Sequence, residues 1–315
     1  MESATANQHS VPQFLLRRFA SSASGKQIFV FDKATERSFS DSVRRVASAS
    51  GFYDCEVQGQ PHSIDPLLTK MESAASNFIN KIIDARTLSV LSDTGRKMVA
   101  LFAAVQMLRT DSQRKQLKGM IDDVYSAVVK IGGDPNKVQG FEFLDEEQTR
   151  THSILSLREI AAELMPHFLD KCWVLYSTTR DNPFYISDNP VAMFNSNQDP
   201  LRGTLGLRVP GIEVHMPLSS TLSLGFLCQT LEREIRGSYD LASALGHPVP
   251  LHVHQLVDAF GGSKPFPLGD ENVKHLNSLQ VFFAERFVFT SRDNFDLIRE
   301  MLRSTPKLKS GPRLG

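Results

Sequence analysis

The pattern of hydrophobic and polar positions divides the chain into a helical middle with strand-rich flanks. After Asp65-Pro66, apolar residues recur every three to four positions as far as Ile82, which predicts a helix that opens at the proline. The same spacing predicts a second helix over about residues 92–108, where apolar residues occupy most faces and indicate a buried position. Two further helices are predicted over about 112–130 and 146–169.

Runs of β-branched and aromatic residues predict strands on both sides of this block. One run lies near the N-terminus at Gln27–Asp32, and the others follow the helices at about 172–178, 184–186, 212–216, 221–227 and 287–290. Helices over about 231–245 and 271–285, and one after the last strand, are interspersed with them.

These elements predict an α+β fold in a single domain over residues 1–304. We expect a central helical block packed against a mixed sheet that is built from N-terminal and C-terminal segments. Residues 305–315 are rich in Lys, Arg, Pro and Gly, and we expect them to form a basic flexible tail.

Composition narrows the environment in which the chain works. The 35 Lys and Arg residues equal the 35 Asp and Glu residues, which argues against coating nucleic acid by bulk charge but allows a local basic cleft. The three cysteines lie far apart, as expected in a reducing cytoplasm. No run of about 18 apolar residues and no secretory signal is present, so neither a membrane span nor export is expected.

Three polar groups are candidates for chemistry. His9 stands in a polar segment before Pro12, where it would act as a general base or would simply tie down the N-terminal segment. Gln106 and Arg109 share one face of the most apolar helix, so the buried guanidinium needs either an anionic ligand or a carboxylate such as Glu72.

The third group follows the strand that ends near Ile186. Ser187, Asp188, Asn189 and Pro190 are placed where a rigid strand would fix active-site side chains. The same residue types form turns, because Asp and Asn bond their own backbone.

Weaker patterns are also present. His247, His252 and His254 would give zinc two ligands on one face if their segment were extended. Asp188 with Glu213 and His215 resembles the spacing of a metal-dependent nuclease, with His in place of the usual Lys. The phosphate loop, the dinucleotide-binding glycines, the nucleophile elbow and the zinc-protease motif do not occur.

Taken in order, these segments resemble the family known as domain of unknown function 4238, which is uncharacterised and mostly bacterial. The likeness covers nearly the whole chain, although residues 113–150 match nothing in it. The chain departs from the family pattern at two places. Leu15 stands where the family frequently has an aromatic residue, and Ile186-Ser187 stands where it frequently has Thr-Ser. The matching stretches are Gln8–Leu15 with Phe19, Ile28–Lys33, Phe52-Tyr53, Met71-Glu72, Gln106–Thr110, Trp173, Ile186–Pro190, Met216–Ser219, Asn277 and Ala284–Ser291.

The resemblance gives weight to His9, Glu72, Arg109, Asp188 and Asn277, because they fall in the family's recurring motifs, but it implies no reaction. One hypothesis is that they converge in a single polar pocket of a hydrolase acting on a phosphodiester or a nucleotide. His9 would then be the acid or base, and Arg109 would stabilise negative charge. Asp188 would orient His9 or hold a divalent metal.

In this hypothesis a small anionic ligand or a nucleic acid is the partner. The substrate would be positioned by Gln8, Glu72, Gln106, Ser187, Asn189 and Asn277. The alternative is a non-catalytic interaction protein whose polar network pins the N-terminal segment into the core. An open pocket with His9, Arg109 and Asp188 on its wall would favour the enzyme, and a closed network would favour the alternative.

Overall fold

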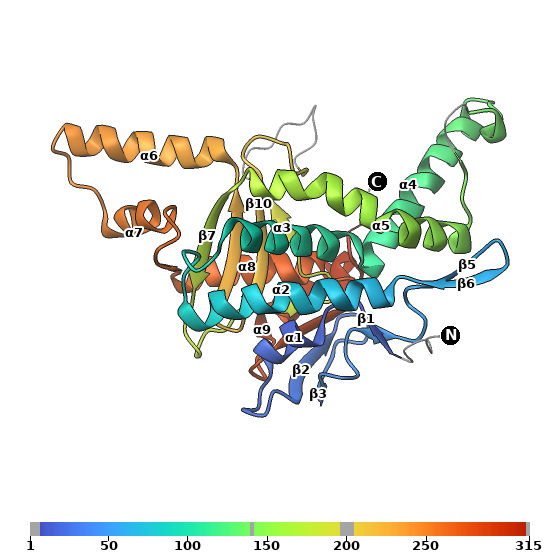
Figure 1. Ribbon diagram of the computed structural model, residues 1–315, viewed down its shortest axis with the longest axis horizontal. Coiled ribbons are helices and arrows are strands. Elements are labelled where there is room, and N and C mark those ends of the chain that lie inside the picture. The colour runs from blue at the N-terminus through green and yellow to red at the C-terminus, as the bar shows by residue number, and fades with distance from the viewer. Residues whose placement is uncertain (1–6, 139–141, 196–204, 313–315) are drawn as a thin grey trace.

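The computed structural model describes residues 7–138, 142–195 and 205–312 (Figure 1). Within these ranges, helices and two larger sheets form one α+β body around a shared hydrophobic core, as predicted. No helix of the described ranges is long and apolar enough to cross a membrane.

A five-stranded mixed sheet lies at the centre of the fold. Its strands β7 and β11 are buried along nearly their whole length, as expected for a sheet that is covered on both faces. The outermost pair, β12 and β7, is parallel, and the other neighbours are antiparallel. In spatial order the strands are β12 (Phe266–Pro267), β7 (Cys172–Ser177), β11 (Leu222–Leu227), β10 (Glu213–Ser219) and β9 (Ala192–Phe194).

A four-stranded sheet joins the two ends of the chain. β2 near the N-terminus pairs with β13 near the C-terminus, which confirms the predicted meeting of these segments. All neighbouring strands in this four-stranded sheet are antiparallel. The sheet that mixes parallel and antiparallel pairs is therefore the five-stranded sheet. Its strands are β3 (Arg37–Ser42), β2 (Gln27–Asp32), β13 (Phe287–Thr290) and β8 (Ile186–Ser187), and two small sheets pair β1 (Gln8–His9) with β4 (Ser48–Ala49) and β5 (Asp54–Val57) with β6 (Gln60–Ser63).

The helical block begins where the local sequence supplies caps. Ser92 accepts the backbone N–H of Gly95, Thr110 accepts that of Gln113, and Asp145 forms a capping box with Gln148. The helices are α2 (Asp65–Ala85), α3 (Asp93–Leu108), α4 (Asp111–Lys130) and α5 (Glu146–Leu169), and short turns precede and follow them at α1 (Gln13–Leu16), η1 (Arg17–Phe19) and η2 (Pro135–Lys137).

Some of the C-terminal helices project beyond the sheet, and others cover it. α6 and α7 extend to one side in Figure 1, whereas α8 lies behind α2 and α3 in that view. α7 falls in a Pro- and Gly-rich stretch that the sequence pattern treats as irregular, and it begins directly after Pro250. The elements are α6 (Gln229–Ala244), α7 (Leu251–Ala259), α8 (Asp270–Phe283), α9 (Asp296–Ser304) and η3 (Pro306–Lys309).

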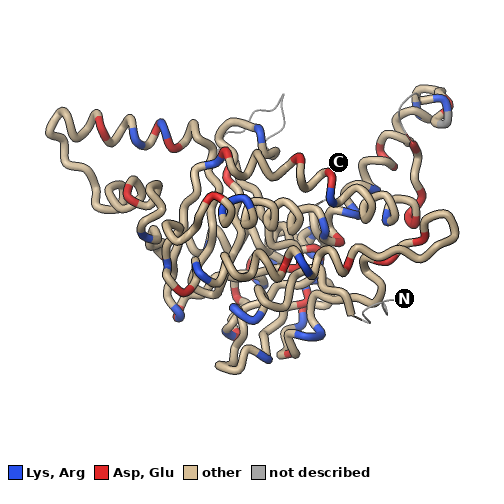
Figure 2. Tube along the Cα trace, in the orientation of Figure 1, with Lys and Arg blue, Asp and Glu red and all other residues tan. Residues whose placement is uncertain are grey.

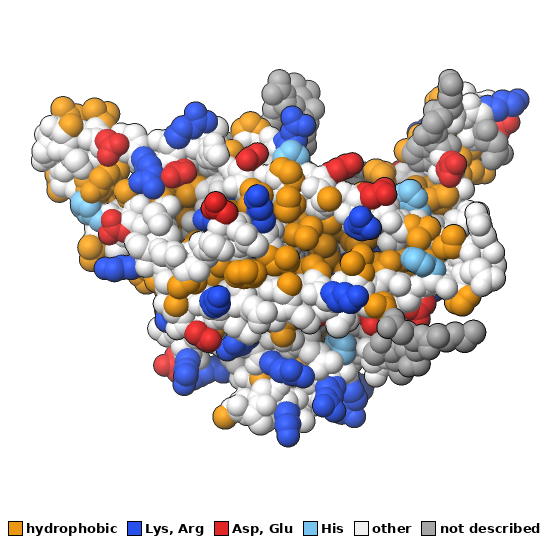
Figure 3. Space-filling model, in the orientation of Figure 1, with side chains coloured by type: hydrophobic (Ala, Val, Ile, Leu, Met, Phe, Trp, Pro, Cys, Tyr) orange, Lys and Arg blue, Asp and Glu red, His pale blue; other side chains and the backbone are white. Residues whose placement is uncertain are grey.

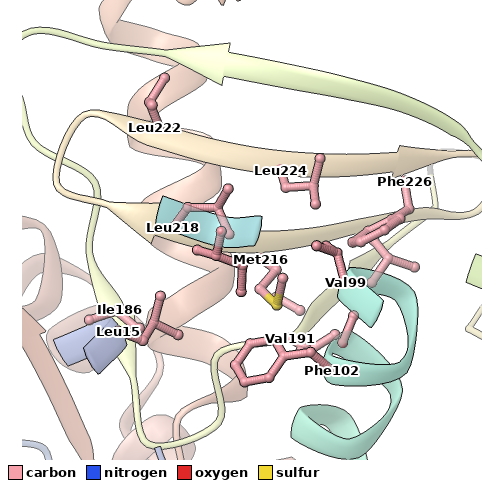
Figure 4. Close-up of a cluster of buried hydrophobic side chains, with 14 of the residues drawn as sticks. Leu15, Val99, Phe102, Ile186, Val191, Met216, Leu218, Leu222, Leu224 and Phe226 are labelled. Atoms are coloured by element: carbon pink, nitrogen blue, oxygen red, sulfur yellow. The ribbon is translucent and has the colours of Figure 1, made fainter. Parts of the chain in front are cut away.

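The core lies between α3 and the five-stranded sheet (Figure 4). Val99 and Phe102 of α3 point toward Met216 of β10 and Phe226 of β11, and all four are fully buried. Leu15 of α1 reaches the same cluster, so the N-terminal segment is anchored in the core. This anchoring fixes the position of the neighbouring His9.

The described part of the predicted tail packs against the body. Leu308 joins a second apolar cluster, and Nζ of Lys309 lies 2.7 Å from Oε1 of Glu36. Figure 2 shows positions of both charge signs along the helices, in keeping with the balanced composition.

Candidate functional site

The segment around Gln8 is held by backbone and side-chain hydrogen bonds. β1 pairs with β4, so that His9 lies opposite Ser48. The Gln8 amide donates from Nε2 to Oδ1 of Asp54 at 2.7 Å, and its Oε1 accepts the backbone N–H of Tyr53. The Tyr53 hydroxyl donates to the carbonyl of His9 at 3.0 Å. Gln8 is buried, and its amide therefore serves to fix the His9 backbone.

The imidazole of His9 has one ring nitrogen without a partner. The backbone carbonyls of Arg44 and Val43 favour the protonated ring, and Nε2 is buried and meets no partner in the described part of the chain. Burial lowers the pKa of His9 despite the opposing effects of these carbonyls and of Glu72, so the ring is neutral at pH 7. A neutral imidazole keeps a free lone pair on one of its two ring nitrogens.

A polar hollow of about 270 Å³ lies next to His9. Much of its wall comes from one side of α2, where carboxylates and hydroxyls recur at helical spacing. No Lys or Arg is among the described residues of the wall, so its formal charge is negative. The volume suits a sugar-sized group rather than a whole drug-sized molecule. The wall consists of Asn7, His9, Gln13, Phe14, Asp65, Thr69, Glu72, Ser73 and Ser76.

Beneath this wall, Arg109 forms the ion pair with Glu72 that the helix pattern suggests. Nη1 of Arg109 lies 2.5 Å from Oε1 of Glu72. Nε donates to the carbonyl of Ser10 and to Oε1 of Gln106, both at 3.0 Å, and Gln106 donates to the same carbonyl at 2.8 Å. Gln106 and Arg109 therefore hold the backbone beside His9 and the side chain of Glu72 at once.

The Arg109 guanidinium is charged but sealed from solvent. Its side chain is fully buried, and burial alone would lower its pKa, but Tyr53, Glu72 and the hydrogen bond to Glu72 raise it. Burial raises the pKa of Tyr53 to about 12, so its phenol is neutral at pH 7 and Glu72 supplies the compensating charge. Nη2 of Arg109 meets no partner in the described structure. The guanidinium is not part of the wall of the hollow and reaches a ligand there only through Glu72.

Asp188 is bonded to three backbone N–H groups. Its Oδ1 accepts the N–H of Glu285, and its Oδ2 accepts those of Arg286 and Phe287, each at 2.8 Å. Burial raises the pKa of Asp188 to about 6, although these three donors and Lys33 act to lower it. The carboxylate thus fixes the turn between α8 and β13 to the end of β8.

The other predicted polar residues near Asp188 also bond within the protein. The Asn277 side chain accepts the N–H of Tyr185 at 2.7 Å and donates to the carbonyl of Pro183 at 3.0 Å. Ser187 donates from its hydroxyl to Oε1 of Gln280 at 3.0 Å. The Asn189 amide donates to the carbonyl of Phe283 at 3.0 Å, and all three predicted residues are buried.

His9 and Asp188 line different hollows. Asp188 lies on a groove of about 750 Å³ whose wall also includes Ser10, Lys115 and Arg286. The segment that carries Asp188 is joined to the end of α3 by a hydrogen bond, in which the Thr110 hydroxyl donates to Oδ1 of Asn189 at 3.1 Å. The predicted segments do come together, but through buried hydrogen bonds rather than around one open pocket.

The weaker sequence patterns are separated by the fold. His252 and His254 lie on α7, where positions two apart face different sides, and Nδ1 of His254 bonds the hydroxyl of Tyr239 at 3.0 Å. Glu213 and His215 line a hollow other than that of Asp188. In the described ranges no three His, Cys, Asp or Glu residues are grouped to hold a metal ion.

Sequence reasoning missed several residues that build the network. Tyr53 supports the His9 backbone, and Gln280 bonds both Ser187 and the carbonyl of Pro190. Lys33 is fully buried and donates to two carbonyls at the end of α8. The signal for Lys33 was a charged residue directly after a buried strand, since such a residue needs partners from elsewhere.

The comparisons with known proteins identify a family but no relative of known activity. The family model described as "Protein of unknown function (DUF4238)" matches residues 7–294, and the chain belongs to this family. No curated protein and no solved structure matches the chain.

Proposed function

Because the chain belongs to a family whose description carries no activity, we propose its function from the site itself: a hydrolase that acts on a nucleotide in the hollow next to His9. One observation carries the proposal. The imidazole of His9 is neutral at pH 7, and its Nε2 meets no partner in the described chain. With its proton on Nδ1, such a ring would accept a proton from water at Nε2.

The charge of the wall favours cleavage between sugar and base over cleavage at phosphorus. Phosphoryl transfer builds negative charge and calls for cations at the reacting group. The hollow presents the carboxylates of Asp65 and Glu72 instead, and Arg109 is sealed behind Glu72. Carboxylates stabilise the positive charge that develops on a sugar ring during glycosidic cleavage.

The chain offers contacts for the rest of a nucleotide. Phe14 on the wall provides an aromatic face, and the hydroxyls of Thr69, Ser73 and Ser76 can bond sugar hydroxyls. Exposed Arg17 donates to Oε1 of Gln13 at 2.9 Å, and Gln13 lines the hollow. A phosphate group outside the hollow would contact Arg17. The proposal therefore retains the small anionic ligand that the sequence predicts.

In the proposed reaction, water attacks the C1′ carbon of the sugar while Nε2 of His9 takes its proton. The new C1′–O bond replaces the C1′–N bond to the base, which leaves with the bonding electrons and a proton from solvent. Glu72 contributes negative charge near the ring, and Arg109 with Gln106 positions Glu72. Gln8 acts by holding the His9 backbone.

Asp188, Ser187, Asn189 and Asn277 lie outside the proposed site. Their hydrogen bonds to backbone groups support a role in holding β8 against α8. We place the reaction in the cytoplasm of a bacterium, which the family resemblance and the three free cysteines support.

The alternative is a non-catalytic interaction protein. The observation that favours it is the hydrogen-bond network in which the side chains of Asp188 and Asn277 hold backbone groups of the protein. In that case His9 would serve only to anchor the N-terminal segment.

A base-release assay separates the two. Purified protein is incubated with adenosine monophosphate and with nicotinamide adenine dinucleotide, and free base and free phosphate are measured by chromatography. We expect base release that falls about 100- to 10,000-fold in His9→Ala, the usual contribution of a general base. The matched control is His152→Ala, because His152 is an exposed histidine on α5.

Equal rates in His9→Ala and the wild type would contradict the proposal. Release of phosphate in place of base would contradict the choice of the glycosidic bond. Absence of any turnover, together with a large loss of thermal stability in His9→Ala, would favour the interaction protein.

A further inference from the structure

A second hollow, of about 240 Å³, lies on the far side of the five-stranded sheet from α3. Side chains of β7, β10 and β12 form one wall, and α6, α7 and α8 form the other. Its polar residues are Tyr176, Glu213, His215, Asn272 and His275, and its apolar residues are Leu227, Leu231, Ile235, Leu256, Phe266, Leu268 and Leu276.

His215 is buried in this wall without hydrogen-bond partners. Its side chain is 4% exposed, and in the described structure neither Nδ1 nor Nε2 has a hydrogen-bond partner. Nε2 lies 3.4 Å from Oε2 of Glu213, which is close enough for electrostatic attraction but is not aligned as a hydrogen bond. A buried imidazole with two unsatisfied nitrogens is costly unless a ligand or water completes it.

The sheet is shaped to bring other side chains to His215. Gly225 of β11 lies opposite His215, and a Cβ at Gly225 would fall 2.5 Å from the ring of Tyr176. The missing side chain lets Tyr176 cross β11, so that its ring centroid lies 5.7 Å from that of His215. His275 approaches from α8, and its ring packs edge-on against Phe194 at 4.6 Å.

The charge of the hollow selects the ligand. Glu213 is the single carboxylate among the described residues that line it, and no Lys or Arg is among them. Glu213 is 21% exposed and thus partly removed from water. Burial and His215 lower the pKa of His275, although Glu213 acts to raise it, so His275 adds no positive charge at pH 7. An anion would meet repulsion here, whereas a cation would neutralise Glu213.

The apolar part of the wall narrows the choice of ligand further. Leucines and an isoleucine from α6 and α7 face Phe266 of β12 across the hollow. A small hydrated cation would gain nothing from these side chains, but an apolar group would be removed from water by them.

We propose that this hollow binds a primary amine with an apolar body. The ammonium group pairs with the partly exposed carboxylate of Glu213 beside His215, while the apolar body packs against Ile235, Leu256 and Phe266. The site is separate from the hollow next to His9, and the two proposals stand or fall independently.

The test is calorimetric titration of the full chain with phenethylamine, with phenylacetate and 2-phenylethanol as anionic and neutral analogues of the same apolar body. We expect phenethylamine to bind and the two analogues to bind at least tenfold more weakly. Glu213→Gln should weaken phenethylamine binding by about tenfold or more, the scale of a charge-assisted hydrogen bond. Glu271→Gln is the matched control, because Glu271 is exposed in the first turn of α8.

A second variant guards against misfolding of Glu213→Gln. Leu256→Trp fills the hollow from α7 and should abolish phenethylamine binding while leaving the circular dichroism spectrum unchanged. Binding of phenylacetate as tight as that of phenethylamine would overturn the proposal. So would phenethylamine binding that survives both variants, or stabilisation by zinc ions alone with none by phenethylamine.

Discussion

Glu72 covers the buried guanidinium of Arg109, with Oε1 of the carboxylate 2.5 Å from Nη1 of the arginine. The arginine is completely shielded, whereas the glutamate is 23% exposed at the wall of the hollow next to His9. The pair therefore connects the packed interior to the surface at which we place the chemistry. Arg109 holds Glu72, and Glu72 presents its charge to the hollow.

Removal of Glu72 should destabilise the fold. In Glu72→Ala the guanidinium of Arg109 stays buried without its counter-charge, and loss of one partner of a buried pair costs about 3 kcal/mol. Urea unfolding of the variant measures this change. The control is Asp84→Ala, because Asp84 is 71% exposed and lies 3.8 Å from Arg18, so that its loss should leave stability nearly unchanged. Equal effects of the two variants would show that Arg109 does not depend on Glu72.

Asn277 should matter for stability and not for substrate binding. In Asn277→Leu the N–H of Tyr185 and the carbonyl of Pro183 lose their buried partner, at a cost of about 2–4 kcal/mol. Chemical unfolding gives this value, and Asn272→Leu is the control because Asn272 is exposed on the same helix. A raised KM for nucleotide with unchanged stability would instead support the substrate-binding role expected from sequence.

Asp188 should make the fold less stable as pH rises. Burial raises its pKa to about 6 in the folded state against 3.8 for the unfolded chain, so the folded state holds the proton more tightly. The resulting stability is complete below pH 4 and is lost as pH rises through 6. Relative to Asp188→Asn, the free energy of unfolding of the wild type should fall by about 2 kcal/mol between pH 4 and pH 7.

Urea unfolding of both proteins at the two pH values measures the difference. A difference that rises with pH would mean that the three N–H donors outweigh burial and hold the pKa of Asp188 below its usual range.

The rate of base release should follow the protonation of His9. Burial keeps the pKa of His9 below 6.5, so the rate should rise as pH increases through the range below 6.5 and stay level near pH 7. The folded protein binds this proton less readily than the unfolded chain, so the contribution of His9 to stability is lost as pH falls below 6.5. A rate that declines between pH 6 and pH 7 would assign the catalytic proton to another group.

Much of the fold could be predicted because its signals are local. The spacing of apolar residues located α2 and α3, and the run Phe287–Thr290 coincides with β13. Short polar strands such as β3 lack that signal and were not predicted. Arg37, Ser38 and Ser40 of β3 are exposed. β3 exists because β2 offers it a pairing edge, which is a tertiary effect.

The site could be predicted only in part. The Glu72–Arg109 pair followed from the cost of an unpaired buried guanidinium, a rule that applies to residue types alone. The bonds of Asp188 to the N–H groups of residues 285–287 depend on how two distant backbones meet, and nothing in the residue types encodes that. The unpartnered Nε2 of His9 likewise depends on how the N-terminal segment packs against distant parts of the chain.

The surface beside α2 also shows why the interaction alternative calls for a direct test. Figure 3 displays apolar side chains across the same face of the molecule, and a largely apolar groove of about 630 Å³ there is lined by residues of α2, α3 and α5. This groove is separate from the polar hollow at His9, so a measurement must report on His9 itself.

The most direct measurement is a nitrogen-15 spectrum of the histidine rings at pH 7, recorded with and without adenosine monophosphate. Our account predicts that His9 is neutral with its proton on Nδ1, and that its Nε2 signal shifts on addition of the nucleotide while that of exposed His152 does not. A His9 ring that is doubly protonated at pH 7, or an Nε2 signal that does not respond to the nucleotide, would contradict the account.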